Sequence, residues 1–279
     1  MPAPAEVIVH PQQRTMVVSL EPVHSALYSL TLVVKADRVS GLGQWVTDTR
    51  NALTPAELEK HRLVIEGFHY TLFSQSDWPT FEAYLDGLER MDPVALRDRL
   101  LDAYIAMPDL REEPSRHQSA KQLLASASNY VDFLISRFGE AYIDPAIEAE
   151  AYRYVIDPRS MQALIVSHLR MMWERFLAAE WQRVQALLAD SVAAFAATDL
   201  EGMSFREAIQ FVTGQQLSDM KWPMPVETFS RFVFVPSAHV GPYLGRFYRG
   251  GEIVVFFGAR LPEGSTIHAP DLSRNDLVV

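Results

Sequence analysis

Two dense apolar runs near the C-terminal end of the chain constrain its fold more than any other feature. Arg231-Phe-Val-Phe-Val235 and Glu252-Ile-Val-Val-Phe-Phe257 are rich in β-branched and aromatic residues, and glycines and prolines interrupt the chain between them. Runs of this kind bounded by Gly and Pro predict strands. Neither run alternates apolar with polar residues, so each strand should be covered on both faces. We expect a C-terminal antiparallel hairpin near 231–258, packed under helices.

The rest of the chain carries clear signals for helix starts. Thr54-Pro-Ala-Glu57 and Ser204-Phe-Arg-Glu207 are capping boxes, and Asp92-Pro93, Asp144-Pro145 and Asp157-Pro158 each place an N-cap acceptor before a proline. The short apolar run at 16–20 indicates one more strand. The fold class is therefore mainly α with a small β element. The predicted helices lie near 22–36, 55–66, 79–90, 93–106, 118–138, 145–155, 159–197 and 204–216.

The predicted helix near 159–197 carries one apolar stripe over many turns. Its apolar residues recur at spacings of three and four, which places them on one helix face. Such a stripe usually faces the core of its own domain, and a dimer seam is the alternative interpretation. The stripe consists of Met161, Leu164, Ile165, Leu169, Met172, Trp173, Phe176, Leu177, Val184, Leu187 and Leu188.

Charge and residue usage disfavour several classes of function. The 279 residues carry a formal net charge of −10, which repels phosphate backbones and argues against nucleic-acid binding by this chain itself. The absence of cysteine excludes disulfides, thiolate catalysis and thiolate zinc sites. No apolar run of about 18 residues predicts a membrane span. We expect a cytoplasmic protein with no membrane partner.

The two ends of the chain differ from its middle. Residues 1–14 are polar and rich in proline, which predicts a flexible N-terminus. Residues 15–262 are expected to form a helical domain. Residues 263–279 resemble a linker that leads into a further element, because Ser273 and Asp276 form a weak capping pattern.

The sequence gives little sign of catalytic chemistry. Glu66-Gly-Phe-His69 is a single Glu-x-x-His unit, whereas di-iron bundles use two such units and two further glutamates. A helical metalloenzyme that uses Glu66 and His69 is therefore a minor alternative. The chain contains no Gly-x-Ser-x-Gly elbow, Walker loop or Gly-x-Gly-x-x-Gly fingerprint. We expect no enzyme activity, no cofactor, no metal and no catalytic residues.

Four residues are candidates for binding a ligand: His69, Trp173, His239 and Tyr243. Trp173, with neighbouring aromatic residues, has the composition of an apolar pocket wall, although ordinary core packing explains the same residues. His239 and Tyr243 follow the first predicted strand in a loop, where either a binding role or an exposed turn is plausible. His168 lies on the apolar stripe and is expected to be a hydrogen-bonded core residue.

One pattern resembles a known family. The segment from Phe232 to Pro242 and the segment from Ile253 to Arg260 resemble a signature in the N-terminal regions of ArsR-like winged-helix transcriptional regulators. That signature has one strand ending in Val-Pro-Ser and a second ending in Tyr-Pro-Ala-Arg-Gly. This chain keeps Val235-Pro-Ser237 and Ala259-Arg260, but it has Phe257-Gly258 where Tyr-Pro is usual.

Two further segments extend the resemblance over most of residues 16 to 260. Trp173 to Asp190 resembles the long helix of the family, including its pair of tryptophans and its closing aspartate. Glu21 to Leu30 resembles the opening helix, although a glutamate usually occupies the position of Ser25 or Ala26.

The resemblance implies a function in bacterial transcription. It implies an effector-sensing, homodimeric regulatory region that binds a small apolar effector. DNA would be contacted only through a C-terminal winged-helix domain, which would begin close to Leu272 and is not present in this chain. The alternative is a protein-interaction module that dimerises without a ligand.

Overall fold

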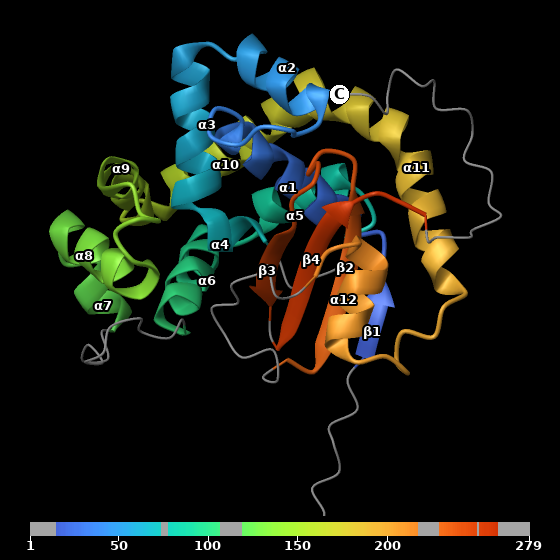
Figure 1. The fold of residues 1–279 in the computed structure, drawn as a ribbon. Coiled ribbons are helices and arrows are strands. Elements are labelled where there is room, and N and C mark those ends of the chain that lie inside the picture. The colour runs from blue at the N-terminus through green and yellow to red at the C-terminus, as the bar shows by residue number, and fades with distance from the viewer. Residues whose placement is uncertain (1–14, 74–77, 107–118, 217–228, 250, 262–279) are drawn as a thin grey trace, which may run out of the picture. The chain divides into compact units, whose positions relative to one another are not determined.

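The computed structural model describes residues 15–73, 78–106, 119–216, 229–249 and 251–261 (Figure 1). The described residues confirm a mainly α fold with a small β element. The expected flexible segment 1–14 and the expected linker 263–279 lie outside them. The chain divides into two compact units, which we call the helical unit (Glu21–Ala186 and Ala238–Gly241) and the sheet unit (Met1–Leu20, Leu187–Ser237 and Pro242–Val279).

The helical unit contains a series of short helices. The structure agrees with most of the predicted helix starts. In chain order the helices are α1 (Pro22–Lys35), α2 (Gln44–Ala52), α3 (Pro55–Gly67), α4 (His69–Leu72), α5 (Phe81–Arg90), α6 (Pro93–Ala106), α7 (Ala120–Leu123), α8 (Ala127–Phe138), α9 (Pro145–Val155) and α10 (Pro158–Met172).

The capping residues act as the sequence predicts. The Thr54 hydroxyl accepts the backbone N–H of Glu57, and the Glu57 carboxylate accepts the backbone N–H of Thr54 at 2.8 Å. Ser204 and Glu207 form the same reciprocal pair at the start of α12 (Phe205–Thr213). The Asp157 carboxylate caps α10 by accepting the N–H of Ser160. These bonds satisfy backbone donors that a helix start leaves unpaired.

One predicted helix is wrong in its extent. The segment 118–138 forms two helices, α7 and α8, rather than one. Ser126 adopts an extended backbone, and its hydroxyl accepts the N–H of Asn129 at 3.1 Å. A serine in this role starts a new helix and thereby interrupts the old one.

The long helix is present but is not α-helical throughout. After α10 the chain forms a π-helical segment, η1 (Trp173–Leu177), and then continues as α11 (Ala178–Ala196). A π segment holds one extra residue within its turn, and such segments are frequent at functional sites. The boundary between the two units falls within α11.

A four-stranded sheet lies in the sheet unit, with strand order β1-β2-β4-β3. Its strands are β1 (Thr15–Val18), β2 (Arg231–Ser237), β3 (Gly245–Arg249) and β4 (Glu252–Gly258). An antiparallel hairpin lies within the expected range 231–258, but it is formed by β3 and β4 rather than by the two apolar runs. The two apolar runs themselves, β2 and β4, pair in parallel with Phe232 beside Ile253. Both strands lie in the middle of the sheet and are buried on both faces, which explains why neither run alternates apolar with polar residues.

The core of the sheet unit lies under α12 and the C-terminal part of α11 (Figure 1). Phe205 at the start of α12 contacts Phe232 of β2, with 4.0 Å between ring centroids. Phe195 of α11 packs edge-on against Phe257 of β4 at 6.0 Å. Aromatic pairs in such arrangements contribute about 0.5–1.5 kcal/mol beyond the area they bury. The apolar face of α12 therefore anchors the sheet.

Candidate functional site

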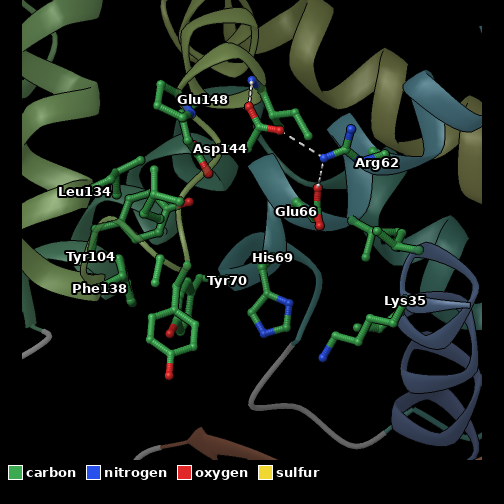
Figure 2. A pocket seen from close by; sticks show the side chains of 18 of the residues that line it. Lys35, Arg62, Glu66, His69, Tyr70, Tyr104, Leu134, Phe138, Asp144 and Glu148 are labelled. Atoms are coloured by element: carbon green, nitrogen blue, oxygen red, sulfur yellow. Dashed lines mark hydrogen bonds and ion pairs between the residues drawn. The ribbon is translucent and has the colours of Figure 1, made fainter. Parts of the chain in front are cut away.

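The helical unit forms a partly open cavity of about 540 Å³ (Figure 2). Side chains reach it from α1, α3, α4, α6, α8 and α9, and from the turn between α8 and α9. A cavity of this volume is in the range that holds small organic ligands. The cavity is lined by carboxyl groups, by cationic side chains, by one histidine and by aromatic rings.

The close approach of α3 and α9 shapes this cavity. Gly67 is the last residue of α3, and a Cβ atom at this position would lie only 2.8 Å from the Cβ of Ala151 on α9. Because real Cβ atoms essentially never approach so closely, glycine is needed at this contact. The start of α9 is fixed by Asp144, whose Oδ1 accepts the N–H of Ala146 at 3.0 Å.

Arg62 links two carboxylates at one side of the cavity. Its Nη2 atom lies 3.0 Å from Oδ2 of Asp144 and 3.3 Å from Oε2 of Glu66 (Figure 2). Burial by itself would raise the pKa of Asp144, but hydrogen bonds from Arg62 and from the first turn of α9 hold it below its usual value. Burial raises the pKa of Glu66, and the charges of Arg62 and Arg38 oppose that rise.

Glu148 is the most perturbed acid of the cavity. The residue is 5% exposed, and its Oε2 atom has no hydrogen-bond partner among the described residues. Burial, with the added negative charges of Glu66 and Asp144, raises the pKa of Glu148 to about 8. Its carboxyl group is therefore mostly protonated at neutral pH. Perturbed acids of this kind concentrate at functional sites.

Three aromatic rings form an apolar wall beside these acids. Tyr70 lies 5.5 Å from Tyr104 and 5.8 Å from Phe138 between ring centroids, and Tyr104 meets Phe138 edge-on at 5.8 Å. Tyr142, from the turn between α8 and α9, also borders the cavity and is 84% exposed. The wall can contact the apolar part of a ligand, or the face of a cation.

A histidine and a lysine lie at another part of the cavity (Figure 2). Burial of its ring and the nearby charge of Lys35 lower the pKa of His69 to about 4, so the ring is neutral at pH 7. Lys35 is solvent-exposed as a residue, but desolvation of its amino group lowers its pKa, and the charge of Glu66 opposes this. A neutral imidazole has one hydrogen-bond donor and one acceptor for a ligand.

The structure places the four predicted ligand-binding residues in different environments. His69 lines the cavity. Trp173 lies in η1, is 8% exposed, stacks on Phe81 at 4.9 Å and donates its indole N–H to Glu82 at 2.9 Å. Tyr243 belongs to the sheet unit and is 39% exposed. Neither Trp173 nor Tyr243 lines the cavity.

His239 is buried in the helical unit within a polar network. Its Nε2 atom lies 2.7 Å from Oε1 of Glu180, and its Nδ1 atom lies 2.8 Å from the hydroxyl of Ser29. The ring stacks on Trp45 at 4.8 Å. The Ser29 hydroxyl donates its hydrogen to the carbonyl of Ser25. Because a carboxylate can only accept, the Nε2 atom of His239 donates to Glu180.

The members of this network are the residue types of a hydrolytic triad, but their arrangement is not that of one. A triad serine donates its hydrogen to the imidazole and is open to substrate. Ser29 instead donates to a backbone carbonyl and is buried. Burial by itself raises the pKa of Glu180, but hydrogen bonds from His239 and Arg183 outweigh it and lower that pKa. The network is suited to fixing residues 238–241 in place.

His168 is a hydrogen-bonded core residue. Its Nε2 atom lies 2.9 Å from Nδ1 of His61, whose Nε2 lies 2.9 Å from the carbonyl of Leu30. Because the carbonyl can only accept, His61 donates to Leu30 and accepts from His168. Burial lowers the pKa of His61 to about 4, and burial with the proximity of His61 lowers that of His168 to about 3.

Several cavity residues carry no chemical signal in the sequence. Glu148 follows the predicted helix start at Asp144 by one turn, where an acidic residue is ordinary. Its raised pKa depends on burial and on the charge of Glu66 of α3, which is distant in sequence. Arg62 likewise lies within a predicted helix, where an arginine carries no chemical signal of its own. The Glu-x-x-His spacing did identify Glu66 and His69, although as possible metal ligands.

Within the parts of the chain that the structure describes, no three His, Asp or Glu residues are grouped so as to hold a metal ion. None of the helices described here is both long and apolar enough to cross a membrane. Comparison of the chain with protein-family models, with curated proteins and with solved structures gives no match.

Proposed function

We propose that this chain is the effector-sensing region of a transcriptional regulator, and that the cavity in the helical unit holds the effector. The observation that carries the proposal is the cavity itself, with buried, pKa-shifted groups beside an aromatic wall. Cavities of this size with a few convergent polar groups are the usual form of a small-molecule site. The charged lining favours an effector with a polar group over a wholly apolar one.

The resemblance to ArsR-like regulators supports the regulatory part of the proposal. The two halves of the resembling signature meet in the sheet unit, where the N–H of Ala259 donates to the carbonyl of Ser237 at 2.9 Å. The carbonyl of Arg260 in turn accepts the hydroxyl of Ser191 on α11 at 2.7 Å. These residues bind to one another, so the signature residues contribute to the fold.

The negative charge of the chain is consistent with DNA contact by a separate domain. A net charge of −10 makes this chain a poor DNA-binding surface. In the proposed regulator, DNA would be contacted by a winged helix outside residues 1–279, and two copies of the chain would form a homodimer. Sedimentation velocity of the purified chain tests the dimer.

Chromatin occupancy tests the proposed function directly. The gene is tagged at its native locus, and the DNA that crosslinks to its product is sequenced. We expect a small set of discrete sites, with transcription of adjacent genes changed when the gene is deleted. Occupancy no greater than that of an untagged strain, together with unchanged transcription, would contradict the proposal.

A further inference from the structure

We propose that the cavity binds an organic ammonium cation, held between the carboxyl group of Glu148 and the rings of Tyr70, Tyr104 and Phe138. This inference rests on the proposed function, because it names the chemical class of the effector. It follows from four observations: an unpartnered buried acid, the distribution of charge around it, the aromatic wall and the net charge of the chain.

The unpartnered acid lies at the wall of the cavity. Glu148 lines the cavity, and only 5% of its surface is exposed. Its Oε2 atom has no hydrogen-bond partner among the described residues. Buried polar atoms in folded proteins are almost always paired. A cationic donor in the cavity would supply the missing partner for this oxygen.

The charges around Glu148 favour a cation at this side of the cavity. Glu66 and Asp144 both raise its pKa by their negative charge. Both pair with Arg62, and the charge of Arg38 also acts on Glu66. Figure 2 draws Lys35 on the opposite side of the cavity from Glu148. A ligand cation would therefore lie nearer to the three carboxyl groups than to the lysine.

The aromatic wall fits the same ligand class. Tyr70, Tyr104 and Phe138 lie within 5.8 Å of one another between centroids. Ammonium groups bind over the faces of clustered aromatic rings, because the ring face carries negative charge density. The net charge of −10 would also attract cations to the chain from solution.

Binding should expel a proton from Glu148. The ionisable groups near it are Glu66 and Arg62 on α3, Asp144 at the start of α9, Tyr104 on α6 and Tyr130 on α8. With a pKa of about 8, Glu148 is mostly protonated at pH 7. A permanent cation favours the carboxylate, so the carboxyl group ionises and its proton passes to the buffer. A neutral ligand would not have this effect.

Titration calorimetry of the purified chain at pH 7 tests this inference. The probes are choline and benzyltrimethylammonium, and the control ligand is 3,3-dimethylbutan-1-ol, the uncharged carbon analogue of choline. A parallel titration in lightly buffered phosphate, followed with a pH electrode, counts the protons released. We expect at least one cation to bind with release of close to one proton, and the alcohol to bind at least tenfold more weakly than choline.

Matched variants locate the site. Glu148→Gln keeps the shape of the side chain but cannot ionise, so it should abolish proton release and weaken cation binding at least tenfold. Glu150→Gln, on the same helix and outside the cavity lining, should change neither. Tyr70→Leu should weaken cation binding and leave the weak binding of the alcohol unchanged. Thermal melts confirm that each variant is folded.

Several results would overturn the inference. These are failure of both cations to bind, equal binding of choline and its uncharged analogue, binding without proton release, or binding unaffected by Glu148→Gln. Such a result together with discrete chromatin sites would reject an ammonium cation as the effector and would still support the regulatory function. Cation binding without chromatin sites rejects the regulatory function alone.

Discussion

The Nε2 atom of His239 lies 2.7 Å from Oε1 of Glu180, and both residues are buried in the helical unit. The two residues are 59 positions apart in sequence, and the other ring nitrogen of His239 contacts Ser29, 210 positions away. One side chain thereby joins the short segment 238–241 to α1 and α11. This contact leads to the first prediction.

Replacing His239 with alanine should strongly destabilise the helical unit. The change leaves the buried carboxylate of Glu180 without one hydrogen-bond donor, and removing the partner of a buried charged group in this way costs about 3 kcal/mol. Urea unfolding followed by tryptophan fluorescence measures the loss. Arg183→Gln is the control, because Arg183 pairs with the same carboxylate from a largely exposed position and should cost less than about 1 kcal/mol. Equal losses in the two variants would contradict this role for His239.

The histidine pair should make the fold sensitive to acid. His61, whose pKa is lowered to about 4, stays neutral in the folded state, whereas an unfolded histidine binds a proton near pH 6.5. The unfolded state therefore holds more protons between these values. The free energy of unfolding should fall by about 3 kcal/mol for this residue as pH falls from 6.5 to 4.

The variant His61→Gln tests this pH dependence. Glutamine can still donate to the carbonyl of Leu30 and accept from His168, but it does not titrate. Unfolding free energies measured at intervals from pH 7.5 to pH 4.5 should fall less steeply for the variant than for the parent chain. Parallel curves would show that His61 is not the source of the acid sensitivity.

Glu148 should have the opposite pH dependence. Its pKa is raised to about 8 in the folded state, so the folded state holds the proton that the unfolded state has already lost above pH 4.5. The contribution to stability is complete below pH 4.5 and is lost as pH rises through 8. Its upper bound is about 5 kcal/mol.

Melting temperatures at pH 6 and pH 9 check this expectation. Glu148→Gln should be more stable than the parent chain at pH 9, and the difference should be smaller at pH 6. Glu150→Gln should show no such change with pH, since its side chain is not buried. A difference between parent and Glu148→Gln that is the same at both pH values would refute the raised pKa.

The contact between Gly67 and Ala151 allows a test by compensation. Gly67→Ala places a Cβ atom 2.8 Å from the Cβ of Ala151, so the helices must separate, at a cost of about 2 kcal/mol. The double variant Gly67→Ala/Ala151→Gly removes the overlapping methyl group and should recover most of this loss. Chemical denaturation of both variants measures it. If the second change gives no recovery, the clash is not the cause.

Local signals in the sequence accounted for the helix starts. The capping box at Thr54 and Glu57 involves residues three positions apart, so the sequence contains all the information that the structure uses. The same is true of Ser204 and Glu207. The missed helix α2 lacks such a signal, because it begins after Gly43 with no side-chain cap.

The sheet and the cavity depend on contacts between distant segments. The apolar runs predicted strands, but local sequence does not determine that Phe232 pairs in parallel with Ile253. In the same way, the raised pKa of Glu148 comes first from its burial in the folded chain and then from the charges of Glu66 on α3 and of Asp144. His69 was identified from its spacing to Glu66, whereas the network around His239 required three segments to be placed in space.

The π-helical segment at Trp173–Leu177 sets the rotational phase of the helix that follows it. One α-helical residue corresponds to about 100° of turn, so winding all five residues of this segment as α-helix would rotate the start of α11 by about that angle and turn Glu180 away from His239. Deleting one residue of the segment would instead remove the extra residue and keep the phase of α11. A chain shortened by one residue here should therefore gain a regular helix and retain its buried histidine network.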